Sequence, residues 1–257
     1  LNLARAGRPM PFECIDMHGH LGRYEFAIPD LSLEGLVASF DRVGIGRYWT
    51  SHMRTMSAEA EWGNAEVYKA MRSFPGRILG AISVWPSDAA TVKRNASRWL
   101  ARGFSGFKLH NSNGFPYTHK VYDPVYRMAD ERRMPILFHT WGEENVLKEI
   151  GEVSRKYPET ALLLAHSGSA NKEGYLRIAK ECPNVYLELT FSRSPRGLVE
   201  EFVAALGAER VVWGSDAVFM SNIQQIGKVI GARIPDAEKR KILSTNAAAI
   251  LARARVG

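Results

Sequence analysis

The chain has little cysteine and no long hydrophobic run. Only Cys14 and Cys182 occur among its 257 residues, which argues against the disulfide framework of small secreted proteins. No apolar stretch reaches the ~20 residues that a membrane-spanning helix needs. We therefore expect a protein of the reducing cytoplasm that has no membrane partner.

The sequence also lacks an interdomain linker and a clustered basic stripe. No Pro-, Gly- or Ser-rich segment divides it, so residues 12–257 are predicted to form one domain. The basic segment 1–11 lacks the apolar core and cleavage site of a secretory signal and is predicted to be a tail. The net charge is +7, but Lys and Arg are scattered, which argues against a nucleic-acid partner. We interpret the charge as a solvated basic surface, which can also attract small anionic substrates. The oligomeric state stays open, a homo-oligomer included.

Short apolar segments alternate with amphipathic ones eight times along the chain. Strands that alternate with helices predict a parallel sheet with helices outside it. Eight such units in about 250 residues predict an α/β fold, a single (β/α)8 TIM barrel. The predicted strands are Cys14–His20, Ile45–Ser51, Ile78–Trp85, Gly106–His110, Pro135–Thr140, Ala161–His166, Val185–Thr190 and Val211–Asp216.

Histidines gather at the ends of these strands. Six of the seven lie at or just past the C-terminal end of a predicted strand, and only His119 lies well inside a connection. In a parallel barrel all strand C-termini meet at one rim, where active sites of this architecture are built. The connections 52–64 and 111–122 are predicted to be loops of this rim. Since Asp216 ends an apolar strand in the same way, the rim is predicted to hold a divalent metal.

The first predicted strand carries His18 and His20 two residues apart. Because side chains alternate along a strand, Asp16, His18 and His20 are predicted to share one face. Gly19 is predicted to leave room for the ion. The pair alone is weak evidence, since many His-x-His pairs are surface features. A metal in such a site activates water and polarises a carbonyl, and the base that assists it is either Asp216 itself or His166.

Five motifs occur in a recognisable order along the chain: IDMHGH (15–20), GFKLH (106–110), ILFHT (136–140), LAHSG (164–168) and WGSD (213–216). With them the chain resembles the amidohydrolase superfamily, in its amidohydrolase-2 branch related to aminocarboxymuconate-semialdehyde decarboxylase and pyrone dicarboxylate lactonase. The resemblance implies a barrel in which His18, His20, His139 and Asp216 hold the metal. It also implies that His166 stands beside the water on that metal.

Two features limit this resemblance. The branch usually has an aromatic residue and a proline after the last-strand aspartate, whereas Ala217, Val218 and Phe219 follow here, so we expect an altered rim beside the substrate. In some amidohydrolases a lysine on the fourth strand is carbamylated and bridges two metals. We favour one zinc ion per chain and a free Lys108 that offers its charge to a substrate anion. Glu188 either faces the barrel or pairs with an interior lysine such as Lys108.

The sequence thus predicts a metal-dependent hydrolase of a small amide, lactone or ester, with His166 and Asp216 as catalytic residues. The same ligands suit a non-oxidative decarboxylase of a small unsaturated or aromatic acid, and a catalytically silent binding barrel is a third hypothesis. The substrate is predicted to be a small molecule with a carboxylate. Its predicted contacts are Lys108, His110, Trp141 and Arg23, each of which competes with a purely structural role.

Overall fold

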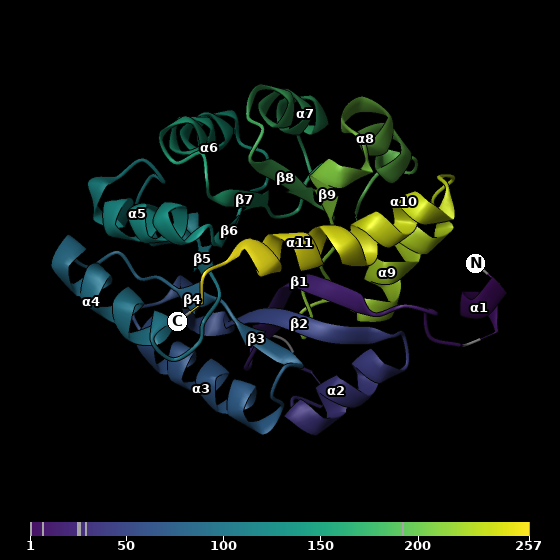
Figure 1. Ribbon diagram of the computed structural model, residues 1–257, viewed down its shortest axis with the longest axis horizontal. Helices are drawn as coiled ribbons and strands as arrows, with labels where there is room; N and C mark the ends of the chain where they lie inside the picture. Colours follow the sequence, from purple (N-terminus) through teal and green to yellow (C-terminus); the bar gives the residue numbers. More distant parts are fainter. Residues whose placement is uncertain (1, 7, 25–26, 29, 192, 257) are drawn as a thin grey trace.

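The computed structural model describes residues 2–6, 8–24, 27–28, 30–191 and 193–256. In this part of the chain nine parallel strands form an inner ring, and helices surround it (Figure 1). The strands are β1 (Cys14–Leu21), β2 (Ile45–His52), β3 (Ile78–Gly80), β4 (Ile82–Ser83), β5 (Phe107–Leu109), β6 (Pro135–Phe138), β7 (Ala161–Leu164), β8 (Val185–Glu188) and β9 (Val211–Val212). The predicted TIM barrel is confirmed.

The strands pair in chain order as two sheets, β1 to β3 and β4 to β9. Backbone hydrogen bonds join the sheets at both edges. Ala81, between β3 and β4, donates to the Thr50 carbonyl (2.8 Å), and Met17 of β1 donates to the Trp213 carbonyl (3.1 Å) after β9. The single strand predicted over 78–85 is therefore two short strands, because β3 pairs with β2 whereas β4 pairs with β5.

The helices form the outer layer, and their bounds follow from caps and buried faces. Ser32, for example, accepts a hydrogen bond from the Gly35 amide (3.1 Å) and begins α2. The helices are α1 (Asn2–Arg5), α2 (Leu33–Asp41), α3 (Ala60–Ser73), α4 (Ala89–Leu100), α5 (Asp123–Arg132), α6 (Glu144–Lys156), α7 (Lys172–Glu181), α8 (Leu198–Leu206), α9 (Asn222–Gly231), α10 (Asp236–Arg240) and α11 (Asn246–Arg253). Among these described helices, none combines the length and apolar character that a membrane span requires. The division into a tail of residues 1–11 and a domain of residues 12–257 stays a prediction.

Both predicted loops contain helical turns. The connection over 111–122 has 3₁₀ turns at Asn111–Asn113 and Lys120–Tyr122, and the other predicted loop is partly α-helical. The connection over 52–64 contains a 3₁₀ turn at Met53–Met56, and α3 already begins at Ala60. The His52 ring accepts a hydrogen bond from the Arg54 amide (3.1 Å) and starts the turn. Ala60 is buried, so the end of this segment belongs to the packed helix layer and the loop prediction was wrong there.

Two hydrophobic clusters divide the core. The larger one lies between the strands and the helices and includes Phe138, Leu162 and Leu187. The smaller one fills the barrel interior, where residues such as Ile15 and Leu163 meet residues of α11. Figure 1 shows α11 crossing one end of the ring, so the polar residues at the strand C-termini lie toward the opposite end.

A bulge in β1 changes which side chains share a face. Met17 and His18 stand opposite the single residue Trp49, since the register shifts between Asp16 and Gly19. His18 and His20 both face Asp216, as their predicted common face requires, but the prediction that Asp16 shares this face is wrong. Asp16 instead accepts the backbone amides of His18 (3.0 Å) and of Ser215 at the last strand (3.0 Å).

Gly19 serves packing and not the ion. A Cβ atom at this position would lie 2.1 Å from ring carbons of Tyr48, so only glycine lets that ring approach β1. The Tyr48 hydroxyl accepts a hydrogen bond from the His20 amide (2.8 Å) and donates to the carbonyls of His20 (3.1 Å) and Ala217. Tyr48 thus ties β1 to the segment that follows β9.

Candidate active site

Seven polar side chains meet at the C-terminal end of the barrel. They are His18 and His20 in β1, Lys108 in β5, His139 after β6, His166 after β7, Glu188 at the end of β8 and Asp216 after β9. The parallel strands bring them together although they span nearly the whole chain. Six of these residues are buried, and His139 is half-buried.

His18, His20 and Asp216 form a group whose ligand atoms all lie within 4.8 Å of one another. The Asp216 Oδ1 atom is 3.5 Å from His18 Nε2 and 3.2 Å from His20 Nε2. Two ligands that each stand about 2.1 Å from a tetrahedral ion are about 3.4 Å apart. Imidazole nitrogen and carboxylate oxygen suit a divalent transition metal, so this donor set fits such an ion.

The protonation states also fit. Burial raises the pKa of the Asp216 carboxyl, but the facing His18 and His20 rings outweigh burial and hold this pKa well below its usual range. Burial lowers the pKa of His18 well below its ordinary value, and Lys108 lowers it further. Burial also lowers the pKa of His20, although Asp216 acts against this shift. At neutral pH the group offers two neutral imidazoles and one carboxylate.

An unusual backbone conformation orients the side chains of Asp216 and His166. Asp216 has φ +55° and His166 has φ +59°, in the left-handed region that costs a residue with a side chain about 1–3 kcal/mol. Both residues come directly after a strand. The sharp turn at Asp216 lets its amide donate to the His18 carbonyl (2.7 Å), which fixes the carboxylate beside β1. Such strained residues gather at functional sites.

His166 has one tautomer that satisfies its surroundings. Its Nδ1 atom lies 3.2 Å from the Thr190 carbonyl oxygen, which can only accept, so Nδ1 carries the proton. Burial lowers the pKa of His166, and Asp216 acts in the opposite direction. The neutral ring stacks on Trp141 at 4.4 Å. His166 therefore keeps a free lone pair on Nε2 and can act as a base.

His139 and His110 line the same site as a stacked pair, with ring centroids 3.8 Å apart. Burial lowers the pKa of His110 to about 2 and that of His139 well below its ordinary value, and the His110 ring lowers the pKa of His139 further. The His139 ring is 5.1 Å from that of His166. Among the described residues, close donor atoms form two groups: His18, His20 and Asp216, and His18, His166 and Glu188. His139 belongs to neither, so its role as the fourth ligand stays a prediction.

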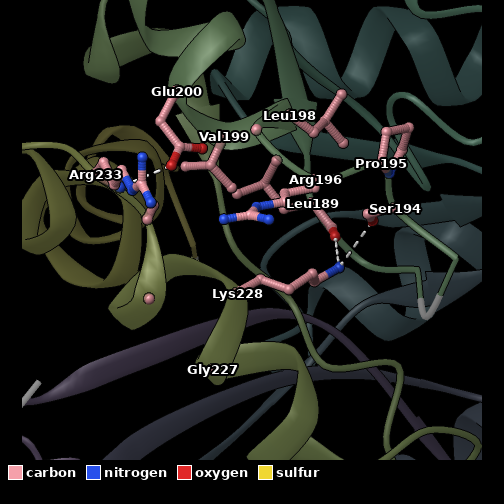
Figure 2. A pocket seen from close by; sticks show the side chains of 13 residues that line it. Leu189, Ser194, Pro195, Arg196, Leu198, Val199, Glu200, Gly227, Lys228 and Arg233 are labelled. Carbon is pink, nitrogen blue, oxygen red and sulfur yellow. Dashed lines mark hydrogen bonds between the residues drawn. The ribbon is translucent and has the colours of Figure 1, made fainter.

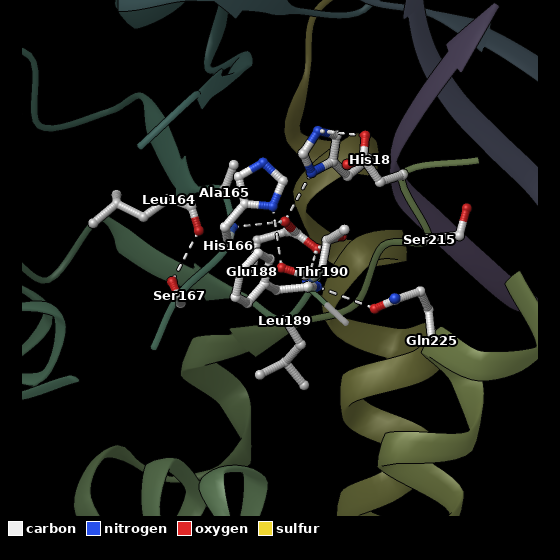
Figure 3. A network of polar contacts seen from close by, with 12 residues as sticks. His18, Leu164, Ala165, His166, Ser167, Glu188, Leu189, Thr190, Ser215 and Gln225 are labelled. Carbon is white, nitrogen blue, oxygen red and sulfur yellow. Dashed lines mark hydrogen bonds and ion pairs between the residues drawn. The ribbon is translucent and has the colours of Figure 1, made fainter. Parts of the chain in front are cut away.

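Lys108 and Glu188 contact opposite sides of His18 (Figure 3 shows the Glu188 side). The Lys108 Nζ atom is 3.2 Å from His18 Nε2, and the Glu188 Oε2 atom is 2.9 Å from His18 Nδ1. Burial lowers the pKa of Lys108 to about 8, against the carboxylates of Asp216 and Glu188. Glu188 thus faces the barrel interior and pairs with His18, and Lys108 does not line the cavity where we expected it to meet substrate.

A cavity of about 190 Å³ lies over this group. Trp141, which is 39% exposed, forms one wall. Arg23 is exposed and is not among the lining residues. Residues that the sequence did not single out as substrate contacts also line the cavity: Tyr24, Met53, Thr55 and Met56, the last three from the predicted rim segment 52–64, and Phe219 from the altered rim after Asp216. Each follows the C-terminal end of a strand, and this position is the one signal that could have identified them.

A separate cavity of about 400 Å³ lies between the residues before α8 and the end of α9 (Figure 2). Lys228 points into this region, but its ammonium group donates to the carbonyls of Leu189 and Phe191 (2.8 Å for the latter) and to Ser194 (3.3 Å). Lys228 therefore holds the segment after β8 in place. The Phe191 ring of this segment contacts Trp141 at 5.2 Å, so the segment supports one wall of the candidate site.

Comparisons with solved structures show the same fold at low sequence identity. The chain is similar to 5-carboxyvanillate decarboxylase from Novosphingobium aromaticivorans, solved with manganese and 4-hydroxy-3-methoxy-5-nitrobenzoic acid (15% identity, 94% of this chain and 96% of that one, TM-score 0.78). It is also similar to 4-oxalomesaconate hydratase from Rhodopseudomonas palustris (15%, 93% and 96%, TM-score 0.73). A third similar protein, from Acinetobacter baumannii with citric acid bound, is assigned as a 2-pyrone-4,6-dicarboxylic acid hydrolase (12%, 94% and 100%, TM-score 0.71).

None of the curated proteins compared with the chain matches it. A family model does: the model described as amidohydrolase (Amidohydro_2) matches residues 15–253, nearly the whole chain. This match includes all the strands except Cys14, the first residue of β1, and all seven polar residues of the site. It confirms the resemblance that the five motifs indicate. The chain belongs to the amidohydrolase family, whose members are enzymes.

Proposed function

We propose that the protein is a metal-dependent hydrolase that attacks the carbonyl carbon of a small amide, lactone or ester with water. The observation that carries the proposal is the convergence of His18, His20 and Asp216 below a cavity that His166 also lines. A divalent ion held by these three residues supplies Lewis-acid activation of water and carbonyl. We propose one zinc ion per chain, with His139 as the further ligand.

His166 is proposed as the general base. Its proton on Nδ1 is engaged by the Thr190 carbonyl, so Nε2 accepts a proton from the attacking water. The lowered pKa of the ring keeps it neutral and competent at neutral pH. Asp216 is the second catalytic group, since its carboxylate stays ionised and lines the cavity.

The cavity walls favour a small, flat substrate. Trp141 stacks nearly parallel to His166, with 15° between the two ring planes, and Met53, Met56 and Phe219 are apolar. Of the predicted substrate contacts, His110 and Trp141 line the cavity, and we retain them. Lys108 is proposed to balance the buried carboxylates instead. The two cysteines are free and buried, which fits the cytoplasmic setting that we propose.

Non-oxidative decarboxylation of a small unsaturated or aromatic acid is the second candidate. The aromatic wall formed by Trp141 favours it, because a planar acid can stack there. The similar manganese-containing structure is that of a decarboxylase. Both reactions use the same proposed ligands, so substrate chemistry separates them.

The test begins with metal binding. Protein purified without added metal is analysed for transition metals, and the metal-free form is titrated with zinc and manganese against a chromophoric chelator. Asp216→Asn is expected to weaken affinity at least tenfold, since it replaces a charged ligand. Asp130→Asn is the matched control, because the Asp130 carboxylate accepts the Glu159 amide (2.8 Å) and does not belong to the ligand group. A metal-free protein that binds neither ion contradicts the proposal.

Reaction class is then read from the products. Hydrolysis in ¹⁸O-water places ¹⁸O in the product, whereas decarboxylation releases carbon dioxide and leaves the product free of ¹⁸O. His166→Ala is expected to lower turnover of either kind and to leave the metal content unchanged. If His166→Ala changes neither metal content nor any detected activity, the barrel only binds its ligand.

A further inference from the structure

We propose that Glu188 is a positioning residue that holds His18 in its Nδ1–H tautomer, so that the Nε2 lone pair faces His20 and Asp216. The inference rests on the proposed metal site and assigns a role to a residue outside the ligand set. It predicts that Glu188 sets metal affinity without contacting the ion.

The geometry on one side of His18 supports this role. The Nδ1 atom lies 2.9 Å from Glu188 Oε2, and both side chains are fully buried. A carboxylate accepts hydrogen bonds and does not donate them, so Nδ1 must carry the proton. Water does not compete for either partner in this interior position.

The other side of His18 requires the same tautomer. The Lys108 Nζ atom is 3.2 Å from Nε2, and an ammonium group has three donors and no acceptor. The Nε2 atom must therefore present its lone pair. The Asp216 Oδ1 atom lies farther from Nε2, at 3.5 Å, so the two shorter contacts, one on each ring nitrogen, place the proton on Nδ1.

Glu188 is itself held in one orientation. Its Oε1 atom accepts the Thr190 amide (2.7 Å) and the Thr190 hydroxyl, and its Oε2 atom also accepts the His166 amide at 3.4 Å (Figure 3). Backbone amides can only donate hydrogen bonds, so these contacts favour the ionised form of Glu188, whose two oxygens both accept. The same end of β8 thus orients both His18 and His166, since the Thr190 carbonyl takes the His166 Nδ1 proton.

His20 provides the contrast. Its Nδ1 atom contacts the Ser51 hydroxyl at 3.0 Å, and a hydroxyl can donate or accept. Ser51 therefore permits either tautomer of His20, whereas Glu188 permits one tautomer of His18. Carboxylates that accept from a metal-binding histidine typically change metal affinity 10- to 100-fold when they are replaced.

The experiment compares Glu188→Gln with Glu149→Gln, whose parent carboxylate accepts the Tyr117 amide (2.8 Å) away from the site. Zinc affinity is measured by chelator competition, and circular dichroism and thermal melting verify folding. Nitrogen-15 spectra of histidine-labelled, metal-free protein report the tautomer of His18, which His18→Gln assigns. We expect Glu188→Gln to bind zinc 10- to 100-fold more weakly and to lose the Nδ1–H tautomer. Glu149→Gln should match the wild type in both.

Three results overturn the proposal: wild-type His18 in the Nε2–H tautomer, a folded Glu188→Gln protein that keeps the wild-type tautomer, or one with zinc affinity within twofold of wild type. If Glu188→Gln does not fold, Thr190→Val removes one bond to the carboxylate, and an unchanged His18 spectrum in that variant also overturns it. A wild-type protein that binds no metal contradicts the proposed function alone, because the tautomer of the metal-free protein still tests Glu188.

Discussion

Tyr48→Phe removes the hydroxyl that ties the first strand to the last. Tyr48 is 1% exposed, and its hydroxyl accepts from the His20 amide (2.8 Å) while it donates to carbonyls of His20 (3.1 Å) and Ala217. The hydroxyl shares its single hydrogen between the two carbonyls, so the variant loses one donated and one accepted hydrogen bond. The His20 amide keeps its bond to the Ala217 carbonyl (2.7 Å) and is not left without a partner.

The expected cost follows from this count. Two net hydrogen bonds at about 1 kcal/mol each give a loss of about 2 kcal/mol. For a domain of this size, 1 kcal/mol lowers the melting temperature by about 2–4 °C, so Tyr48→Phe is expected to melt about 4–8 °C below the wild type. Zinc affinity should also fall, because the lost bonds lie beside His20 and next to Asp216 in the chain.

Tyr126→Phe is the matched control for Tyr48→Phe. Tyr126 is also buried, and its hydroxyl donates one hydrogen bond, to the Tyr117 carbonyl (2.6 Å), away from the ligand group. It should melt about 2–4 °C below the wild type and bind zinc normally. Differential scanning calorimetry and chelator competition measure both quantities. The reasoning fails if Tyr48→Phe loses no more stability or affinity than Tyr126→Phe.

Three further changes probe the cavity wall, the segment behind it and the core. Trp141→Leu is expected to weaken substrate binding at least severalfold and to leave the metal content unchanged. KM measurements and metal analysis check both. A loss of metal in the variant would contradict the placement of Trp141 in the cavity wall. Burial lowers the pKa of Lys228 from 10.5 to about 8, so the unfolded chain binds more protons between these values and stability rises with pH across that window. Urea unfolding measures the free energy of unfolding of the wild type and of Lys228→Met. Between pH 7 and pH 10 the wild type should gain stability relative to the variant. A difference that does not change with pH would contradict the lowered pKa of Lys228. Burial raises the pKa of the Cys14 thiol to about 12, so neither Cys14 nor the equally buried Cys182 should react with a thiol reagent at pH 8 until urea is added; fast labelling of the native protein would count against the packing described.

The sequence pattern predicted the barrel well where a strand is continuous and apolar. The strand predicted at 14–20 lies within β1, which runs from Cys14 to Leu21. The sequence pattern failed to predict strand bounds where the choice of the neighbouring strand decides them. The segment 78–85 divides because its two halves face different neighbours, and β9 ends at Val212 because the chain turns at Asp216 with positive φ. Hydrophobic pattern contains no information on partner choice.

The site was predictable to the same degree. His18, His20, His166 and Asp216 were identified because strand ends in a parallel barrel converge on one rim. The partner of Glu188 was not predicted, since His18 lies 170 positions away in the chain and the pattern does not show the register shift in β1. Lys108 was expected to meet substrate, but its length lets Nζ reach His18 inside the barrel. Contacts across the interior depend on side-chain geometry that no spacing in the chain encodes.

Charge connects the buried interior with the proposed chemistry. Lys108 lies near the carboxylates of Asp216 and Glu188, Lys228 also acts on Glu188, and the histidines are neutral because burial lowers their pKa values. The two lysines thus balance the two carboxylates of the metal-free interior. A divalent cation held there would make the balance positive, so the proposed loaded site would favour a substrate that carries a negative charge. An anion of the small size that the cavity accepts is then the substrate most consistent with both the barrel interior and the basic surface.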